Sequence, residues 1–366
     1  MLRRLAYIEN RKVLADNGEV TSDVTVRDPI TALWVELRAT NGASGNKANL
    51  LAQCVDAIEL IDGSEVLVSL DGYEAFARAA YKMQYIPYNL VCETEGLTQN
   101  LYVPILFGRY LGDQQLAFDP TKFSNPQVRF KWNLAAVQAV GDKGFVSGSA
   151  TLTIVADVME GAAAPSGMVT AKQHYSFTTA DSGVEYIDLP TDQVLKALYI
   201  RCHENGVGQF ANITNVKLNC DQGKFVPFDM RRTDLLRYLT LYYPPFHYKH
   251  VFKVADGDTV YFIPKLDEQF VFQSEVADCV VNAPNNGIGE ATCSVYVAGT
   301  ASTDPQNVWA LVHGWLPFGV AYLPFGDSDD PSSWFQPQTF RSVRLELTQG
   351  NAGASAAVVV EQARPY

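Results

Sequence analysis

The sequence is poor in the residues that build metal sites and disulfides. Five histidines occur in 366 residues, with no HxH pair and no HExxH helix. His247 and His250 form an HxxH, but in a Pro- and Tyr-rich strand or loop their side chains would diverge, so a shared metal ion is not expected. The cysteines lie singly, without a CxxC pair, as is typical of reduced, buried thiols in a protein made in a cytoplasm. They are Cys54, Cys92, Cys202, Cys220, Cys279 and Cys293.

Long apolar runs are also missing. No run of 18 apolar residues occurs, so no membrane-spanning helix is predicted. The start, MLRRLAYIENRK, contains arginines but no apolar h-region, so no secretion signal is expected. The net charge is −12, which makes sequence-specific binding to nucleic acid unfavourable and instead favours solubility.

Local motifs for catalysis are missing as well. There is no GxSxG elbow, and Ser147 and Ser149 lie in a glycine turn. Gly206–Gly208 lacks the third glycine and the Lys-Ser/Thr of a phosphate loop, and the acidic turn Asp327–Asp330 lacks the spacing of an EF-hand calcium loop. We therefore predict no catalytic, cofactor-binding or metal-binding residue and no cofactor. A pair of distant carboxylates, as in glycosidases, would leave no local signature.

Aromatic residues, in contrast, are abundant: 18 Tyr, 19 Phe and 5 Trp. With 47% hydrophobic and 19% charged residues, the chain can bury a large core and is not disordered. Many Val, Thr and Gly/Pro turns add to a β-rich composition, and 366 residues suit two domains.

In the first half of the sequence, the pattern of apolar residues and turns predicts about eight strands and one short helix. A helix should begin at Gly72, capped by Asp71, because its apolar positions recur at helical spacing. Those positions are Tyr73, Phe76, Ala77, Ala80 and Tyr81. The clearest strands are Ile30–Leu37, Ala57–Ile61, Val66–Leu70, Tyr85–Val91, Leu101–Phe107, Val128–Trp132 and Ala150–Val158.

The second half repeats this order. The matched segments are Leu33–Val35 with Leu198–Ile200, Ile58–Leu60 with Val216–Leu218, Val66–Leu70 with Lys224–Phe228, the helix cap Asp71 with Asp229, Leu101–Pro104 with Tyr261–Pro264, Gly112-Asp113 with Gly326-Asp327, and Val128–Trp132 with Val343–Leu347. Individual matches are weak, but their common order predicts an internal duplication. The Gly-Asp stretches should mark where each unit crosses between its two sheets.

Eight antiparallel strands per unit suit a jelly roll, and the lack of long crossover helices argues against a doubly wound α/β fold. We predict an all-β protein of two tandem eight-stranded antiparallel jelly rolls, with one short helix in each. Residues 1–20 would form an N-terminal arm or a first edge strand, 21–160 the first jelly roll and 171–366 the second. A linker at 161–170 would join them, and the second roll would carry an insertion around 269–317.

Two groups of side chains are candidates for partner contact. Aromatic residues in loops either form subunit contacts or pack under their own loops. They are Trp309, Trp315, Phe318, Trp334 and Phe335. Arg231, Arg232 and Arg237 form one small basic cluster, which either faces a partner or lies on a solvated helix face.

The stretches PITALWVELRATNG, IELIDGSEVLVSLDGYEAFARAAYKMQY and LYVPILFGRYLGDQQLAFDPTKFSNPQVRFKWN carry a resemblance. Over residues 20 to 366 the chain resembles the double jelly-roll major capsid proteins of tailless icosahedral viruses, the lineage of adenovirus hexon and the membrane-containing phages. The second-half insertion has no counterpart in that pattern, and residues 1–20 show no membrane-facing helix.

The resemblance implies a structural protein rather than an enzyme. Its partner would be itself, as a homotrimeric, pseudo-hexagonal capsomer of a virion made in a host cytoplasm and assembled into a capsid lattice. A vertex (penton) protein, minor capsid proteins and an inner membrane would be further partners. Two other readings stay open at this point: a carbohydrate- or receptor-binding double β-sandwich, and a β-sandwich hydrolase with a dispersed carboxylate site.

Overall fold

The structure, a computed structural model, describes most of the chain. The described residues are 2–42, 50–90, 96–137, 144–204, 209–254, 259–262, 270–274, 279–282, 291–297 and 306–366.

The first jelly roll packs two sheets face to face. One sheet contains, in spatial order, β1 (Leu2–Val13), β9 (Thr151–Glu160), β3 (Ile30–Thr40), β7 (Thr98–Leu106) and the short β6 (Asn89–Leu90). The opposing strands are β2 (Asn17–Asp23), β8 (Pro126–Asn133), β4 (Val55–Asp62) and β5 (Glu65–Leu70). Leu33, Val35 and Leu37 of β3 are buried in the core, as the period of two along a strand predicts.

The second jelly roll repeats this arrangement. One of its sheets contains, in spatial order, β10 (Gly167–Thr178), β23 (Ser355–Pro365), β12 (Val194–His203) and β21 (Val320–Pro324). The opposing four are β11 (Gly183–Asp188), β22 (Val343–Gln349), β13 (Ile213–Cys220) and β14 (Phe225–Arg231). The order β1-β9-β3-β7 thus recurs as β10-β23-β12-β21, and β2-β8-β4-β5 recurs as β11-β22-β13-β14. The predicted double jelly roll is confirmed.

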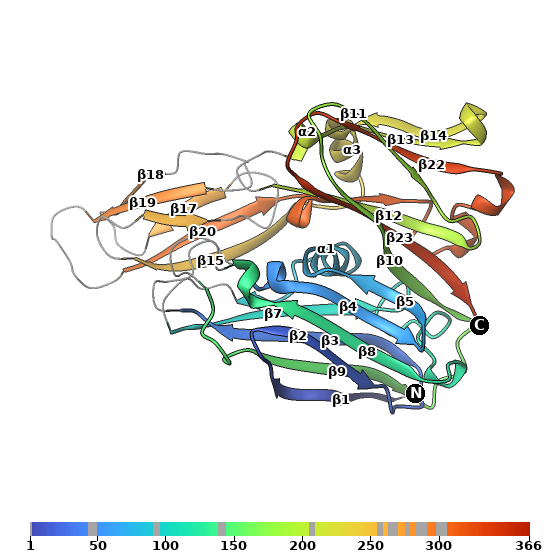
Figure 1. The fold of residues 1–366 in the computed structure, drawn as a ribbon, viewed down its shortest axis with the longest axis horizontal. Coiled ribbons are helices and arrows are strands. Elements are labelled where there is room, and N and C mark those ends of the chain that lie inside the picture. The colour runs from blue at the N-terminus through green and yellow to red at the C-terminus, as the bar shows by residue number, and fades with distance from the viewer. Residues whose placement is uncertain are drawn as a thin grey trace.

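The two rolls lie one above the other (Figure 1). Strand β5 of the first roll pairs in parallel with β10 of the second. Therefore β2-β8-β4-β5 and β10-β23-β12-β21 form one continuous eight-stranded sheet that runs through both rolls.

Irregularities in the strand ladders also recur. Strand β3 shifts register against β9 between Ile30 and Ala32, and β12 shifts against β23 between Leu195 and Ala197. Strands β1 and β10 shift against β9 and β23 at matching places. Because a bulge is a defined feature of a sheet, these shared bulges confirm the internal duplication and fix which residues correspond. The counterparts used below are Leu2 with Met168, Leu5 with Ala171, Trp34 with Tyr199, and Asp157 with Glu361.

The segments between β7 and β8 and between β21 and β22 each cross from one sheet to the other, as predicted. The predicted match of Gly112 with Gly326 is wrong, because Gly108 is the counterpart of Gly326. A Cβ on either Gly108 or Gly326 would lie 2.4 Å from a backbone oxygen, that of Leu116 or of Ser333 respectively. Glycine is required where the backbone approaches so closely.

The predicted match of Val128 with Val343 is also wrong, by two residues. Val128 pairs with Leu60 of β4, and Leu345 pairs with Leu218 of β13. Leu345 is therefore the counterpart of Val128.

The two principal helices begin differently. Helix α1 (Gly72–Met83) begins as predicted, and Asp71 and Glu74 form a capping box. Helix α3 (Arg232–Leu239) has Arg231 at its N-cap, without a side-chain cap. The predicted cap Asp229 lies in β14 instead and accepts a hydrogen bond from the Asn215 side chain. A single short turn, α2 (Gln209–Asn212), precedes β13.

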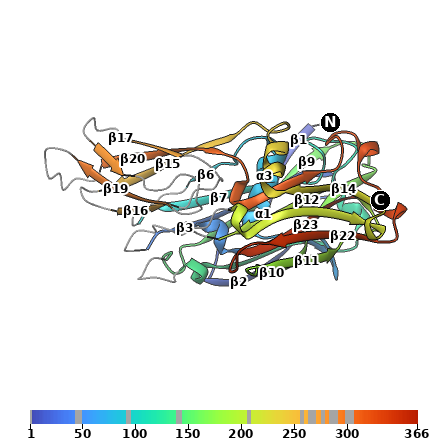
Figure 2. The same cartoon turned by 90° about the horizontal axis from the view of Figure 1, so that it is seen from above.

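Among the described residues, six further strands lie between α3 and β21. They are β15 (Phe246–Val254), β16 (Thr259–Phe262), β17 (Phe270–Ser274), β18 (Cys279–Asn282), β19 (Ala291–Val297) and β20 (Gln306–Gly314). They form two small sheets, β15-β20-β17 and β16-β19-β18, at one end of the molecule (Figures 1 and 2). These strands begin before the predicted insertion at 269, and the counterpart of β7 is β21, so the match of Tyr261–Pro264 with Leu101–Pro104 is wrong.

The N-terminal residues form an edge strand rather than a separate arm, because β1 pairs with β9 along its length. Residues 161–166 connect β9 to β10, within the predicted linker segment. Cys54, Cys202 and Cys220 are free and buried, as predicted. The side chains of the other three cysteines lie outside the described residues.

Candidate functional site at the junction of the two jelly rolls

Helix α1 lies between the two rolls (Figure 1). Its sequence predicts one apolar face, yet every residue from Gly72 to Tyr81 is buried, including the charged Glu74 and Arg78. One side of the helix packs on β4, β5 and β7 of its own roll, and another side contacts β12 and β21 of the second roll. The junction between the rolls is therefore built around α1.

A buried ionic cluster holds the C-terminal half of α1 to the second roll. Glu361 of β23 is fully buried. Its carboxylate accepts a hydrogen bond from Arg78 Nε at 2.9 Å and forms ion pairs with Lys82 Nζ at 3.0 Å and Lys196 Nζ at 3.3 Å. Arg78 and Lys82 also donate to the backbone oxygens of Leu106 and Gly108. One carboxylate thus joins cations from both rolls.

The electrostatics of this cluster follow from its burial. Burial alone would raise the pKa of Glu361, but the charges of Lys196, Lys82 and Arg78 hold that pKa well below its usual range. Burial and the neighbouring cation Arg78 lower the pKa of Lys82, although Glu361 opposes this. Removing one partner of such a buried group leaves uncompensated charge, which is strongly destabilising.

A second ionic contact holds the N-terminal end of α1. Arg201 of β12 lies 3.0 Å from Asp71 and 3.5 Å from Glu74. Burial and the adjacent Asp71 raise the pKa of Glu74 to about 8, although Arg201 opposes this. Both ends of α1 are therefore tied to the second roll by side chains of opposite charge.

Aromatic packing fills the space between these ionic contacts. Phe318, from the short turn before β21, lies 4.7 Å from Tyr73 and 5.0 Å from Phe76 between ring centroids. Tyr81 stacks on Tyr322 at 5.1 Å and donates a hydrogen bond to the backbone oxygen of Val320. Buried aromatic pairs of this kind stabilise by burial and by their ring geometry.

A cavity of about 180 Å³ adjoins the ionic cluster. Buried Lys82 and Lys196 lie on its inner side, and the exposed Gln84, Tyr110 and Asp329 lie at its outer side. The cavity is polar, and it lies where segments of the two rolls meet.

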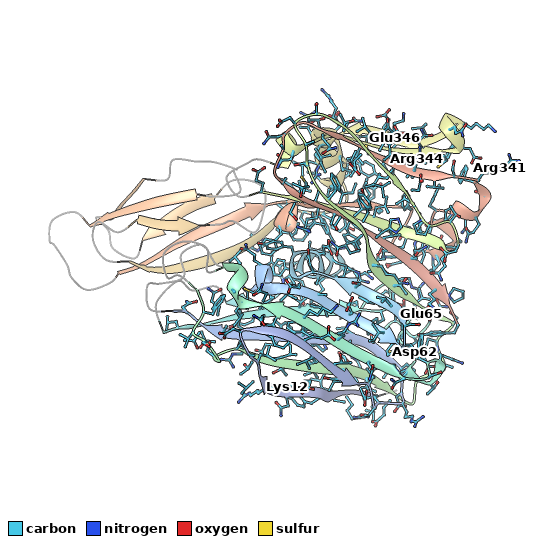
Figure 3. All side chains as sticks on the ribbon, in the orientation of Figure 1. Lys12, Asp62, Glu65, Arg341, Arg344 and Glu346 are labelled. Atoms are coloured by element: carbon cyan, nitrogen blue, oxygen red, sulfur yellow. The ribbon has the colours of Figure 1, made fainter. Side chains whose placement is uncertain are left out.

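Backbone pairing completes the junction. Ala171 and Lys172 of β10 pair with Val68 and Ser69 of β5. At the outer end of this pairing Arg364 lies 3.1 Å from Glu65, which Figure 3 labels at the edge of the first roll.

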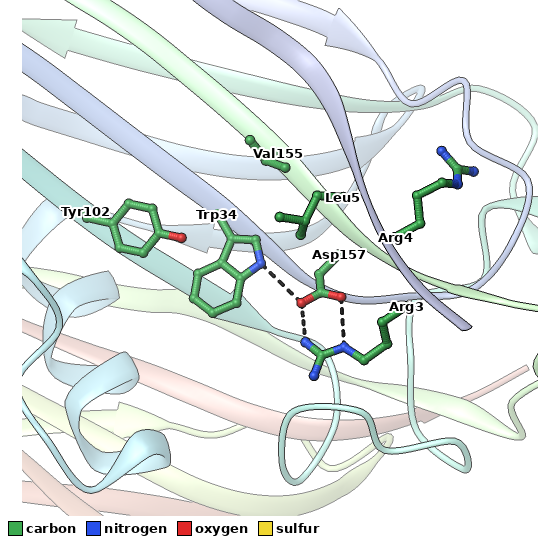
Figure 4. Close-up of a pocket in the computed structure, with 7 residues that line it drawn as sticks. All are labelled: Arg3, Arg4, Leu5, Trp34, Tyr102, Val155 and Asp157. Atoms are coloured by element: carbon green, nitrogen blue, oxygen red, sulfur yellow. Dashed lines mark hydrogen bonds and ion pairs between the residues drawn. The ribbon is translucent and has the colours of Figure 1, made fainter. Parts of the chain in front are cut away.

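The first roll has an equivalent outer sheet face, and among the described residues no element of the second roll packs on it in the way that α1 packs on β12 and β21. There Asp157, the counterpart of Glu361, accepts hydrogen bonds from Arg3 Nε at 3.1 Å and from Trp34 Nε1 at 3.3 Å (Figure 4). A recess of about 410 Å³ surrounds this group. Its lining residues are Arg3, Arg4, Leu5, Trp34, Tyr102, Val155 and Asp157.

The loop aromatics proposed from the sequence as contact residues separate into two groups. Phe318 and Trp334 are buried within the chain, so the alternative of internal packing holds for them. Trp334 donates through Nε1 to the backbone oxygen of Asp327 at 2.7 Å. Trp315 and Phe335 are partly buried against the core, and the side chain of Trp309 lies outside the described residues.

The basic cluster is also divided. Arg231 and Arg237 are exposed and both pair with Asp234. Arg232 is buried and donates to the backbone oxygen of Gly319 at 3.2 Å. The three arginines therefore do not form one basic surface.

The motifs judged non-catalytic fall in turns and strands. Ser147 bonds to Asp16, and Asp330 caps the short turn that begins at Pro331. His247 is exposed in β15. The side chain of His250 and the segment Gly206–Gly208 lie outside the described residues. Within the described part of the chain, no three His, Cys, Asp or Glu side chains gather as metal ligands. No helix there is long and apolar enough to cross a membrane.

Sequence reasoning missed the ionic residues of the junction. A usable signal was present, because Lys196 and Glu361 each interrupt an otherwise apolar strand, in VLKALYI and AAVVVEQ. A charged residue in a buried strand requires a partner of opposite charge. The sequence does not say that the partners lie on a helix of the other roll.

The fold is a double jelly roll, and solved structures of similar fold are viral major capsid proteins. The chain is similar to the major capsid protein of Sulfolobus Turreted Icosahedral Virus, with a TM-score of 0.61, 11% identity, and coverage of 99% of this chain and 96% of that one. It is similar to the major capsid protein P2 of bacteriophage PM2, with a TM-score of 0.56, 11% identity, and coverage of 100% and 98%. The capsid protein of PBCV-1 gives a TM-score of 0.56 at 11% identity, with coverage of 99% and 93%.

Sequence comparisons give no further relative. No family model matches the chain, and no curated protein sequence matches it. At 11% identity the structural likeness establishes the fold.

Proposed function

We propose that this chain is a major capsid protein that forms homotrimeric capsomers of an icosahedral virus or phage shell. The observation that carries the proposal is the full-length match in fold to major capsid proteins, with both rolls in the same chain. Three chains with two rolls each supply six rolls, which suits a pseudo-hexagonal building block.

The junction supports this role physically. A shell subunit must hold its two rolls in one fixed relation so that contacts with neighbours repeat without error. The continuous eight-stranded sheet, the buried Glu361 cluster and the packing of Phe318 on α1 together provide that rigidity.

The proposal includes the division of the chain into a first roll up to residue 160, a linker at 161–170 and a second roll from 171. The chain's partner is a second copy of itself, first in a trimer and then in a lattice within the virion. A vertex protein, minor capsid proteins and an inner membrane are the further partners that this role implies.

The test is the assembly state of the purified chain. Light scattering should give three times the chain mass of 40.3 kDa, and electron microscopy should show particles of hexagonal outline. A stable monomer that binds glycans on an array would contradict the capsid role and favour an adhesin-like double β-sandwich.

A further inference from the structure

The same sheet is covered in one roll and uncovered in the other. In the second roll, the sheet β10-β23-β12-β21 is covered by two elements of the first roll. Helix α1 packs on its outer face, and strand β5 pairs with its edge strand β10. In the first roll, the corresponding sheet β1-β9-β3-β7 ends in the free edge β1. Leu2 and Leu5 of β1 are 73% and 64% exposed, whereas their counterparts Met168 and Ala171 are fully buried.

The covering elements also have counterparts, and these are exposed as well. Strand β14 corresponds to β5 and is the free edge of its sheet, with Phe225 47% exposed. Helix α3 corresponds to α1 and packs on β13, β14 and β21 as α1 packs on β4, β5 and β7. Counted from the first residue of each helix, Tyr81 and Lys82 of α1 match Leu241 and Tyr242, which lie in the hydrogen-bonded turn directly after α3.

Leu241 and Tyr242 form an apolar and aromatic surface at the end of α3. They are 78% and 52% exposed. Tyr242 lies with its hydroxyl 3.0 Å from that of Tyr238, the counterpart of Arg78. Exposed large apolar side chains grouped in one place on the surface are typical of a protein interface.

We propose that α3 and β14 of one copy dock on the Asp157 recess and the β1 edge of a neighbouring copy, repeating between chains the contact that α1 and β5 make within the chain. This inference rests on the proposed self-assembly and names the surfaces that carry it. The occupant is a second copy because this chain contains both surfaces of the contact twice. One set, α1 with β5 and the sheet of the second roll, is in contact within the chain, and the other set, α3 with β14 and the sheet of the first roll, is exposed.

The chemistry of the two surfaces is complementary. In the chain's own junction Arg78 and Lys82 meet the carboxylate of Glu361. Between copies, the hydroxyl groups of Tyr238 and Tyr242 meet the ion pair of Arg3 and Asp157, whose exposed member is Arg3, and Leu241 enters the recess beside Trp34 (Figure 4). A surface that is exposed before assembly uses neutral phenols, since each hydroxyl can donate to a carboxylate without the desolvation of a buried cation.

The strand edges match as well. Residues Val68 and Ser69 of β5 pair with β10, and their counterparts on β14 are Phe228 and Asp229. These would pair in parallel with Leu5 and Ala6 of the next copy. The two surfaces lie on different parts of the chain, so the contact is head-to-tail and forms a closed ring when the rotation closes.

Cysteine cross-linking tests the arrangement. A chain that carries both Leu5→Cys and Phe228→Cys should form covalent dimers and trimers under mild oxidation, seen on a denaturing gel without reductant, because the counterparts of these two residues, Ala171 and Val68, are directly paired. The parent chain and each single variant give the background. The matched control pairs Phe228→Cys with Tyr186→Cys, because Tyr186 is 58% exposed on β11, away from both surfaces.

A second variant separates assembly from folding. Leu241→Asp should weaken association about tenfold, as for loss of a central interface residue, while thermal unfolding of the free chain stays unchanged. Trimers that do not cross-link through positions 5 and 228 and that tolerate Leu241→Asp overturn the proposed surfaces but leave the capsid role intact. A chain that is monomeric at every concentration overturns both.

Discussion

Strands β1 and β10 occupy the same place in their two rolls but lie in different environments. Met168 and Ala171 of β10 are buried against β5 and α1, whereas Leu2 and Leu5 of β1 face solvent. The difference arises because β5 of the first roll pairs with β10, whereas no described strand pairs with β1 on the side away from β9. Burial at a given fold position therefore depends on the neighbouring roll, and the next copy would supply that neighbour for β1.

The same contrast extends to the acidic residues beside these strands. Glu361 is surrounded by three cations, and its side chain is fully buried. Asp157 pairs with Arg3, whose side chain is 42% exposed. Both carboxylates are buried, but the partners of Glu361 are buried with it, whereas Arg3, the partner of Asp157, reaches solvent.

The largest expected difference comes from neutralising these two carboxylates. Glu361→Gln should lower the free energy of unfolding by about 3–5 kcal/mol, because it leaves Arg78, Lys82 and Lys196 buried without a carboxylate. Asp157→Asn should cost about 1–2 kcal/mol, since Arg3 can turn to solvent. Urea unfolding of the dissociated chain measures both values. Equal losses would show that the burial of the cationic partners does not distinguish the two positions.

Truncating the paired apolar residues gives the next largest difference. Met168→Ala should cost about 2–4 kcal/mol, because a fully buried side chain leaves a cavity. Leu2→Ala should change the free energy of unfolding by less than about 0.5 kcal/mol in the free chain. The comparison is made by urea unfolding below the concentration at which chains associate. A large loss for Leu2→Ala there would mean that β1 is already covered within one chain.

These predictions depend on features that the sequence reveals unequally. Alternating apolar residues and turns predict both rolls, their order and the capped helix at Asp71, because each is a local pattern. The register of β22 was mispredicted, because a shift of two residues preserves alternation and leaves the pattern unchanged. The counterpart of Gly326 was mispredicted because a Gly-Asp dipeptide is only a local turn signal, whereas the pairing of β7 and β21 with their neighbours decides which glycine corresponds. The cap of the second helix was also mispredicted, since Asp229 is used by β14.

The junction itself could be predicted least. That α1 would be buried on both sides, and that Arg78 would meet a residue 283 positions away, depends on how the two rolls pack. A contact between residues so far apart in the sequence produces no local periodicity from which it could be predicted. Charged residues within apolar strands, at Lys196 and Glu361, are the one trace it leaves in the sequence.

The dependence of stability on pH should separate the two ends of α1. The folded pKa of Glu361 is lowered, so its stabilisation is present above its ordinary value of 4.5 and is lost as the pH falls below that value. The folded pKa of Glu74 is raised to about 8, so the stabilisation from its protonated form is lost as the pH rises from 4.5 through 8. Each group contributes at most about 1.4 kcal/mol per pH unit.

The measurement is urea unfolding between about pH 3.5 and 9 for the parent chain and two variants. Glu361→Gln should flatten the acid side of the profile, and Glu74→Gln should flatten the side that approaches pH 8. Profiles that remain parallel to that of the parent would show that neither group titrates differently in the folded chain.

The smallest effect concerns a pair of cross-strand contacts whose charges are exchanged between the rolls. Glu59 of β4 pairs with Arg129 of β8, and at the same place Lys217 of β13 pairs with Glu346 of β22 (Figure 3 labels Glu346). Both pairs lie directly opposite across antiparallel strands, so each should contribute about 0.5 kcal/mol whichever strand carries the acid. Double-mutant cycles with Ala at both positions of each pair measure the two coupling energies. Equal values would show that selection at this position preserves opposite charge and not a particular residue, whereas coupling in one roll alone would mean that the two contacts are not equivalent.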